Sequence, residues 1–468
     1  MELSCILDWA KMAAVTSDGV SAPLPGRCGF YVVKKKRYCK MVVGKGKTFC
    51  GEHGNADSDS ERKRIPCPLD PKHTVFEDSL SKHLKKCNSK EKPKPVYYVK
   101  DINAGSVTEE EIAIDEVSIA ERSKEELYRL IQKLKTAVKG LNTEPDTSLL
   151  SHPALNEALN DPKNGNFAFK HLKQQASILG NMEALELLGP ERCYVEFGAG
   201  KGKLSHWIHV ALQEAENVHF LLVERSSTRF KVDGKHKNTD STFDRLQVDI
   251  QHLDLSRVPF LQEKQLPVIA VGKHLCGAAT DLALRCLFER SAKDKDNEPP
   301  TKRIKLQEGG EEVMQGSESS EEVVVSGLTV ALCCHHRCEW RHYVGKDFFR
   351  ERGLGATEFS AFQRMSSWAT CGMNRVKSSL NPEKSSHDIK YEEEGEEVEH
   401  EGSSENFPDH LNNAISAEER ERVGRLCKML IDHGRLHYLQ QRGFKPSLRF
   451  YTSWDVSLEN VLLTALPS

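Results

Sequence analysis

The chain has 468 residues, with 66 Lys and Arg against 69 Asp and Glu and a net charge of −3. Hydrophobic residues make up 38% and charged residues 29%, which indicates a folded core diluted by polar segments. No run of about 18 apolar residues is present, so we expect no membrane-spanning helix. We also expect no secretory signal, and therefore read the 14 cysteines as reduced thiols or metal ligands in the nucleus, the cytoplasm or both.

The charge is unevenly distributed along the chain. Residues 27–100 hold 19 Lys and Arg against 8 Asp and Glu, whereas acidic blocks lie at 308–322 and 392–405. A basic segment beside a balanced larger domain indicates a polyanionic partner, and a merely soluble basic surface is the alternative.

The chain order predicts two small modules ahead of one large domain. The predicted parts are a disordered tail (1–26), two Cys/His modules (27–55 and 64–91), a helical linker (108–140) and a domain (151–468) with disordered insertions at 291–322 and 374–413. Leu127, Ile131, Leu134 and Val138 give the linker an amphipathic helix, ended by Gly140. We expect this helix to pack on its own domain rather than form a coiled-coil dimer. The large domain alternates apolar runs with helical patterns, which is typical of a parallel α/β sheet.

Two groups of Cys and His have the composition of metal sites. The first group is Cys28, Cys39, Cys50 and His53, and the second is Cys67, His73, His83 and Cys87. Each group supplies four N and S ligands, which suits closed tetrahedral zinc, whereas scattered buried thiols and surface histidines are the alternative. The second group resembles the CHHC finger of some RNA-associated proteins.

A glycine-rich turn follows the first predicted strand of the large domain. Residues 193–197 lead into Gly198, Gly200 and Gly202, whose spacing differs from the G-x-G-x-x-G dinucleotide fingerprint. The next predicted strand, 218–223, ends in Glu224. An acidic side chain at this place can bind two ribose hydroxyls.

Further polar residues follow later predicted strands. Asp249 ends strand 246–250, Lys273 and His274 follow strand 267–271, and Cys333, Cys334, His335 and His336 follow strand 327–332. Ligands of open α/β sheets bind at the carboxyl ends of strands, so we expect these groups to converge. Segments 447–454 and 458–465 predict a closing antiparallel pair.

Glu196 and Glu224 around the glycines, together with the terminal pair, resemble the class I S-adenosylmethionine-dependent methyltransferases. That family has a Rossmann-like α/β fold with a seven-stranded sheet ending in an antiparallel hairpin. The two zinc modules followed by VEFGAGKGKLS, VGKHLCGAATD, LCCHH, SSWA and SLEN resemble, more narrowly, the eukaryotic tRNA ribose 2′-O-methyltransferases that act on nucleotide 4 of the acceptor stem. The residues alone would indicate a zinc-binding methyltransferase that acts on RNA.

The resemblance implies roles for particular residues. Gly198, Gly200 and Gly202 would hold the methionine part of S-adenosylmethionine, Glu224 its ribose, and Asp249 would lie near its adenine unless it is a plain surface strand end. Glu196 would support the loop or the cofactor's amino group. Two structural zinc ions, a tRNA acceptor stem as partner and a monomeric chain complete these expectations.

A ribose hydroxyl is a weak nucleophile at neutral pH, so a base should assist its attack. Lys273 and His274 are the first candidates, with His335 and then His336 behind them, although Lys273 gripping a phosphate remains equally open. We expect the crowding of Cys333, Cys334, His335, His336 and Cys338 to reflect buried thiols and a substrate-facing histidine rather than a third metal.

Two other classes of protein fit parts of the pattern. One is a noncatalytic zinc-finger RNA-binding protein with a degenerate methyltransferase fold, and the other is a methyltransferase of proteins or small molecules. The basic run 299–306 separately predicts a nuclear import signal in the first insertion.

Overall fold

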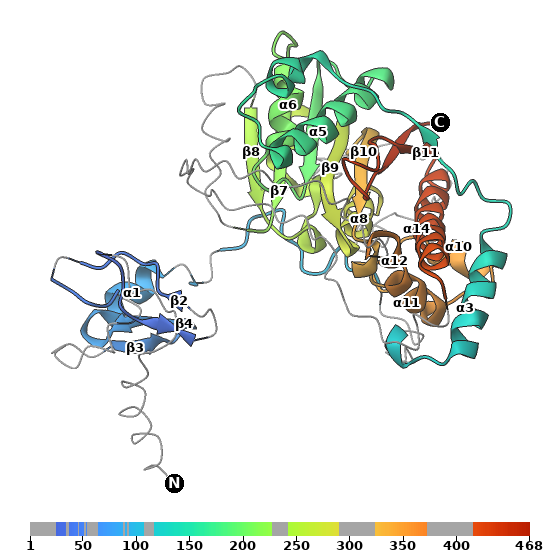
Figure 1. Ribbon diagram of the computed structural model, residues 1–468. Helices are drawn as coiled ribbons and strands as arrows, with labels where there is room; N and C mark the ends of the chain where they lie inside the picture. The colour runs from blue at the N-terminus through green and yellow to red at the C-terminus, as the bar shows by residue number, and fades with distance from the viewer. Residues whose placement is uncertain are drawn as a thin grey trace, which may run out of the picture. The chain divides into compact units, whose positions relative to one another are not determined.

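The computed structural model describes residues 25–33, 37–44, 46–50, 53, 64–87, 89–90, 93–106, 117–226, 242–289, 323–371 and 415–468, without the side chains of Lys72, His274 and Cys371. The chain divides into a small unit, 1–94, and a large unit, 95–468 (Figure 1). The first 24 residues of the predicted tail, both predicted insertions and the predicted import signal lie outside the described residues. Among the described residues, no helix combines the length and apolar character needed to cross a bilayer.

The small unit consists of two short antiparallel hairpins and one helix. Strand β1 (Tyr31–Val32) pairs with β2 (Arg37–Tyr38), and β3 (Arg64–Cys67) pairs with β4 (Asp70–Phe76), which leads to helix α1 (Leu80–Lys86). The buried core beside the first hairpin is formed by three cysteine side chains, with Phe30 and Phe49 packed against them. A core this small contributes little burial energy, so this unit needs another source of stability.

A mixed, mostly parallel sheet forms the centre of the large unit. Its strands are β5 (Asp146–Thr147), β6 (Arg192–Phe197), β7 (Val218–Glu224), β8 (Thr242–Gln247), β9 (Val268–Cys276), β10 (Val325–Cys333), β11 (Phe444–Phe450) and β12 (Val461–Pro467). Their order is β5-β11-β12-β10-β9-β6-β7-β8. Strands β10, β9, β6, β7 and β8 run parallel, and β12 lies antiparallel between β10 and β11, so the predicted α/β class and closing hairpin are confirmed.

The sheet differs from the predicted one in its number of strands and in the bounds of several of them. The sheet has eight strands rather than seven, because the two-residue β5 pairs in parallel with β11. Strand β8 begins at Thr242 and ends at Gln247, ahead of Asp249, and its alternating polar and apolar residues offer no apolar run from which these bounds could be predicted. Strand β9 continues through Lys273 and His274 to Cys276. The terminal hairpin comprises 444–450 and 461–467 instead of 447–454 and 458–465.

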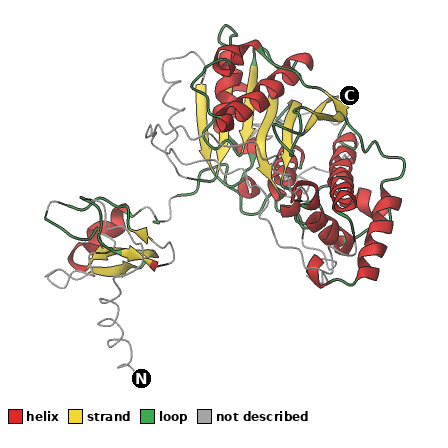
Figure 2. Cartoon of the chain, in the orientation of Figure 1, coloured by secondary structure: helices red, strands yellow, loops and turns green. Residues whose placement is uncertain are grey.

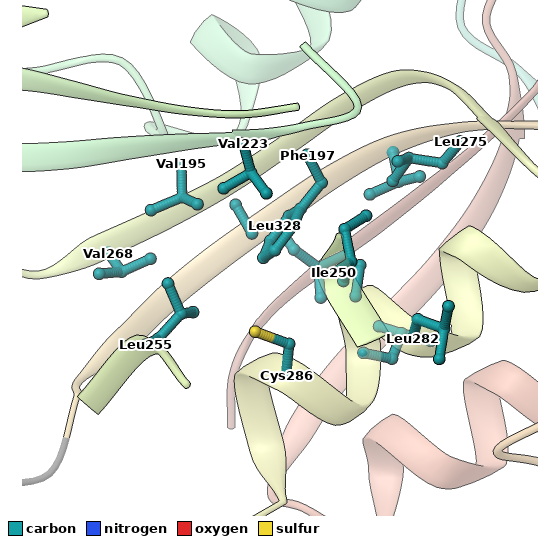
Figure 3. Close-up of a cluster of buried hydrophobic side chains, with 14 of the residues drawn as sticks. Val195, Phe197, Val223, Ile250, Leu255, Val268, Leu275, Leu282, Cys286 and Leu328 are labelled. Carbon is teal, nitrogen blue, oxygen red and sulfur yellow. The ribbon is translucent and has the colours of Figure 1, made fainter. Parts of the chain in front are cut away.

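Helices pack on both faces of this sheet (Figure 2). The helices described in the large unit, of which some pack on the sheet and others beside it, are α3 (Lys124–Ala137), α4 (Asn156–Leu159), α5 (Asn166–Ala184), α6 (Lys203–Ala211), α7 (Pro259–Lys264), α8 (Ala278–Phe288), α10 (Lys346–Glu351), α11 (Ala356–Met365), α12 (Trp368–Cys371) and α14 (Ala417–Gln440). Because side chains alternate along a strand, Val195 and Phe197 join the core that contains Leu282 and Cys286 of α8, as Figure 3 shows. Tyr194 points to the other face and packs with residues of α5 and α6.

Another core lies beside the sheet and is built mainly from helices, with residues of the connecting loops. Leu127, Ile131 and Leu134 of α3 are buried there with residues of α10, α11 and α14. The helix begins with a capping box between Ser123 and Glu126, and Val138 is its C-terminal cap. The predicted amphipathic helix therefore exists, and its apolar face packs on its own unit rather than forming a coiled-coil seam.

A buried ionic network joins α14 to α8 and to the turn after β10. The Arg435 guanidinium donates to Asp432 at 2.8 Å and to Asp281 at 2.6 Å, and all three side chains are at most 1% exposed. His335 lies 2.8 Å from Asp432 on the other side. Burial alone would raise the pKa of Asp432, but His335 and Arg435 lower it below its ordinary value. Each charge in this network therefore depends on its neighbours.

Removing the guanidinium should leave the buried Asp281 carboxylate without its ion-pair partner and should leave Asp432 with His335 but without Arg435. We predict that Arg435→Ala lowers the free energy of unfolding by about 3–5 kcal/mol. Arg422→Ala is the matched control on the same helix, because Arg422 pairs with Glu419 at the exposed surface and should cost less than about 1 kcal/mol. Urea unfolding followed by tryptophan fluorescence measures both, and equal losses in the two variants would contradict the role of the network.

Candidate functional site

The first Cys/His cluster brings together residues spread over 26 positions. Cys28, Cys39, Cys50 and His53 place their ligand atoms within 4.8 Å of one another. The Nδ1 atom of His53 lies 3.4 Å from the sulfur of Cys28 and 3.3 Å from that of Cys50. The Phe30 ring stacks on His53 with centroids 4.0 Å apart and fixes the orientation of the imidazole.

The second cluster has the same compactness. The Cys67 and Cys87 sulfurs are 3.8 Å apart, the Nε2 atoms of His73 and His83 are 3.1 Å apart, and His83 lies 3.2 Å from the Cys67 sulfur. Zn–S bonds of about 2.3 Å and Zn–N bonds of about 2.0–2.1 Å place the ligands of a tetrahedral site about 3.3–3.8 Å apart. Both predicted ligand sets are therefore assembled at distances close to those that zinc requires.

The glycine turn connects β6 to α6 at the carboxyl edge of the sheet. Gly198, Gly200 and Gly202 all have positive φ angles, of 62°, 48° and 72°, which side chains with a Cβ rarely tolerate. Glu196, only 3% exposed, accepts hydrogen bonds from the backbone N–H and the hydroxyl of Ser205 in the first turn of α6. Glu196 therefore ties the strand before the turn to the helix after it.

The two other predicted carboxylates follow the adjacent strands. Glu224, half-buried at the end of β7, accepts from the backbone N–H of Gly200 at 3.0 Å and of Ser226 at 2.9 Å. Asp249 follows β8, accepts from the backbone N–H of Gln251 at 3.0 Å and keeps 41% of its side chain exposed. The structure thus brings the glycines, Glu224 and Asp249 to neighbouring strand ends, as the sequence predicted.

Lys273 lies on β9 and points to the α5 face of the sheet. Its Nζ atom is 2.9 Å from Nδ1 of His171, and both side chains are more than nine-tenths buried. Burial, with the charges of Lys273 and Lys203, lowers the pKa of His171 to about 4. The His171 ring is therefore neutral at pH 7, and its Nδ1 accepts a hydrogen bond from the lysine.

The strand is irregular immediately after Lys273. Lys273 pairs with Ala331 and Leu275 pairs with Leu332, so His274 is an extra residue in β9. Bulges of this kind occur often beside active sites, where they re-aim a side chain. The His274 side chain itself lies outside the described residues.

The two histidines after β10 lie in different surroundings. His335 is 1% exposed and belongs to the network with Asp432 and Arg435, so it holds the turn in place and does not line an open surface. His336 is half-buried, and burial lowers its pKa. Its backbone oxygen accepts from the side chain of Gln363, which anchors the same turn. The contacts of His335 are therefore those of the buried ionic network, whereas Lys273 contacts His171.

Sequence reasoning missed His171 and Cys276. His171 has a recognisable signal, because the buried face of α5 carries a polar stripe that also includes Gln174, Gln175, Ser177 and Asn181, where an apolar stripe is the norm. Cys276 ends β9 and lies beside Cys333 and Cys334, whose hydrogen bonds lower the pKa of its thiol below the ordinary value. Because the strand was predicted to end at residue 271, the contact of Cys276 with Cys333 and Cys334 was not predicted.

From β6 the chain adds β7 and β8 on one side of the sheet and then crosses over to add β9 and β10 on the other side, so that β6 and β9 flank a topological switch point. The glycine turn and Glu224 lie at the carboxyl edge beside this point. This arrangement is typical of α/β proteins that bind nucleotide-type ligands at a switch point, and the chain adds to it two Cys/His clusters with the composition of zinc fingers. Three family models match the chain: Methyltransferase TRM13 over residues 173–466, the CCCH zinc finger in TRM13 protein over 26–54, and the U11-48K-like CHHC zinc finger over 64–88.

Similar proteins extend along nearly the whole chain. The tRNA:m(4)X modification enzyme TRM13 homologs of Mus musculus and Homo sapiens are 56% and 57% identical, over 97% of this chain and 97% and 98% of their own lengths. The tRNA:m(4)X modification enzyme TRM13 of Schizosaccharomyces pombe is 32% identical over 86% of this chain and 96% of its own length. The chain belongs to the TRM13 methyltransferase family.

The depressed pKa of His171 predicts a specific pH dependence of stability. In the unfolded chain a histidine titrates near 6.5, whereas folded His171 titrates at about 4. Between these values the unfolded state binds a proton that the folded state does not, so stability falls as the pH falls. We predict a loss of about 2–3 kcal/mol across this window, measured by urea unfolding at several pH values.

Other groups also titrate in acid, so the variant carries the test. His171→Gln should flatten the stability profile between pH 6.5 and pH 4, because the variant lacks the buried ring whose pKa is lowered on folding. A His171→Gln profile parallel to that of the unaltered chain would contradict the buried neutral ring.

Proposed function

We propose that the chain transfers a methyl group from S-adenosylmethionine to the 2′-hydroxyl of the ribose at nucleotide 4 of a tRNA acceptor stem. The observation that carries this proposal is the Glu224 carboxylate, bonded to the Gly200 N–H at the end of β7 and beside the glycine turn. The related proteins of mouse and human are named tRNA:m(4)X modification enzymes, and they align with 97% of the chain.

The strand order supports the class I fold, with β12 inserted antiparallel as in the terminal hairpin of that class. S-adenosylmethionine supplies a methyl group on a positively charged sulfur, which leaves readily. Glu224 would bind the two ribose hydroxyls of this cofactor with its carboxylate oxygens. The left-handed glycines bring the backbone close to the methionine part, and Leu275 closes the turn, since a Cβ on Gly198 would lie 3.0 Å from it. Asp249 would lie at the adenine end.

The acceptor hydroxyl must be aligned with the methyl group and must lose its proton. Lys273 is fixed by His171, and in-line positioning is the larger contribution when the leaving group is good. We assign Lys273 as the residue that contacts the acceptor nucleotide and His171 as the residue that positions it. His274, the extra residue in β9, is assigned to the same strand end as a proton acceptor. His335 keeps a positioning role in the turn after β10.

The basic segment 27–100 would bind the phosphates of the stem. Each zinc finger would be held by one structural zinc ion, because ligand bonds replace the apolar core that this unit lacks. A-form RNA offers little base readout in its deep groove, so shape, phosphates and 2′-hydroxyls should carry recognition. Binding should therefore weaken steeply with salt.

Cofactor binding tests the carboxylate directly. We predict that Glu224→Gln raises the dissociation constant of S-adenosylmethionine by about 10- to 100-fold, because hydrogen bonds to a charged group contribute about 1.5–3 kcal/mol. Glutamine keeps one acceptor for the Gly200 N–H, so the turn should survive. Glu263→Gln, at an exposed position of α7, is the control and should bind S-adenosylmethionine with unchanged affinity. Calorimetry that gives equal affinities would remove Glu224 from the cofactor site.

The reaction itself is tested with unmodified tRNA and cofactor carrying a labelled methyl group. A methylated 2′-oxygen cannot attack its own 3′ phosphate, so alkaline hydrolysis should leave a gap in the ladder after nucleotide 4. Lys273→Met should lower methyl transfer by about 10²-fold or more while cofactor affinity stays close to normal, and Lys264→Met should be fully active. Label on a base, with an unbroken ladder, would contradict ribose methylation.

A further inference from the structure

Three cysteines from two strand ends form a group that the methyl-transfer site does not use. Cys276 ends β9 and Cys333 ends β10, and these two residues are paired in the register of the parallel strands. Their sulfur atoms are 3.4 Å apart. Cys334 joins them, so that the three sulfur atoms all lie within 4.8 Å of one another, and both Cys333 and Cys334 are buried.

We propose that Cys276, Cys333 and Cys334 hold a third zinc ion, at the carboxyl edge of the sheet. The Cys276–Cys333 distance of 3.4 Å falls within the 3.1–3.8 Å that separates ligand atoms in the two finger clusters of the same chain. Three thiols this close together, two of them buried, satisfy one another poorly, because sulfur is a weak donor and a weak acceptor. A soft divalent cation is the partner that such ligands prefer.

The backbone around the group is built to bring the sulfurs together. Gly277, directly after Cys276, has φ 61° and ψ −127°, and a Cβ at this position would collide with the carbonyl oxygen of Arg337. The turn after β9 therefore approaches the turn after β10 more closely than any other residue would allow. Cys334 itself is left-handed, with φ 49°, and its backbone N–H donates to Glu459 at 3.3 Å. Strain of this kind at a residue other than glycine marks functional sites.

The donor set also indicates the type of zinc site. Among the described side chains, no fourth Cys, His, Asp or Glu joins the three thiols within the same distance. Structural zinc has four protein ligands, whereas zinc with three protein ligands keeps its fourth position for water or substrate. Cys276 lies on the same strand as Lys273, three residues further along. The third site therefore has a replaceable ligand at the edge of the sheet where the acceptor nucleotide is proposed to bind.

A disulfide is the competing state of the same residues. A Cys276–Cys333 bond would require the sulfurs to approach from 3.4 Å to about 2.05 Å and would leave Cys334 unpaired. Oxidation also requires an oxidant that removes two electrons, which the proposed transfer reaction does not supply. Zinc uses all three thiolates without any redox step and releases only protons.

Zinc analysis of the purified full-length chain tests the proposal independently of methyl transfer. We expect three zinc ions per chain, and two in either Cys276→Ser or Cys334→Ser. Cys427→Ser, a buried cysteine of α14 outside the group, should retain three. Cys67→Ser should retain two, and Cys67→Ser combined with Cys276→Ser should retain one, because the finger and the third site lie in different units.

Replacement of zinc by cobalt keeps the test valid if a variant fails to fold. Thiolate-to-cobalt absorption of the unaltered chain should report eight thiolates, of which five belong to the fingers. Alkylation with iodoacetamide should spare Cys276, Cys333 and Cys334 until a chelator removes the metal. Two zinc ions in the unaltered chain, with free alkylation of these thiols or a recovered Cys276–Cys333 disulfide, would overturn the third site.

Discussion

The large unit depends on one guanidinium group that is enclosed by two carboxylates. Charges removed from water are tolerated only when they are paired, so Arg435 fixes Asp281 of α8 and Asp432 of α14 in one geometry. Helix α8 packs on the sheet and α14 packs on the helical core, so this network connects the sheet to the helical core. His335 extends it to the turn after β10, where Cys334 and His336 lie. The buried ion pairs of Arg435 thus help to fix the turn after β10, at the edge of the sheet where the proposed chemistry takes place.

Local pattern was sufficient to predict β6, the glycine turn and β7, because an apolar run, three glycines and a terminal carboxylate follow one another directly in the chain. It failed for β8, whose alternating polar residues resemble a loop, and for β9, whose polar residues Lys273 and His274 suggested that the strand had ended. Both Cys/His clusters were predicted from residue type and spacing, and the second also from its resemblance to the CHHC finger. The partnership of His171 with Lys273, 102 positions apart, was not, because only the packing of α5 on the sheet brings them together.

The two units obtain their stability from different sources. The large unit buries two apolar faces of a sheet and a separate helical core. The small unit buries mainly the sulfur atoms of its own ligand groups, so metal and fold are inseparable there. Loss of zinc should consequently abolish the shape of the small unit while the sheet stays folded, which would separate the proposed RNA binding from the proposed methyl transfer.

Strand β11 lies next to one edge of the sheet. It has β12 on one side, and among the described residues its other side pairs only with the two residues of β5, at Arg449 and Phe450. The remainder of that side would be free to recruit a strand from another molecule if its sequence were regular. Lys445 is exposed there and Pro446 has no N–H to offer, and charge and proline are the means by which natural sheets discourage such pairing. Lys445 and Pro446 therefore protect this edge of the sheet against pairing with another molecule. Replacing both should leave an edge that can pair with a strand of a second molecule.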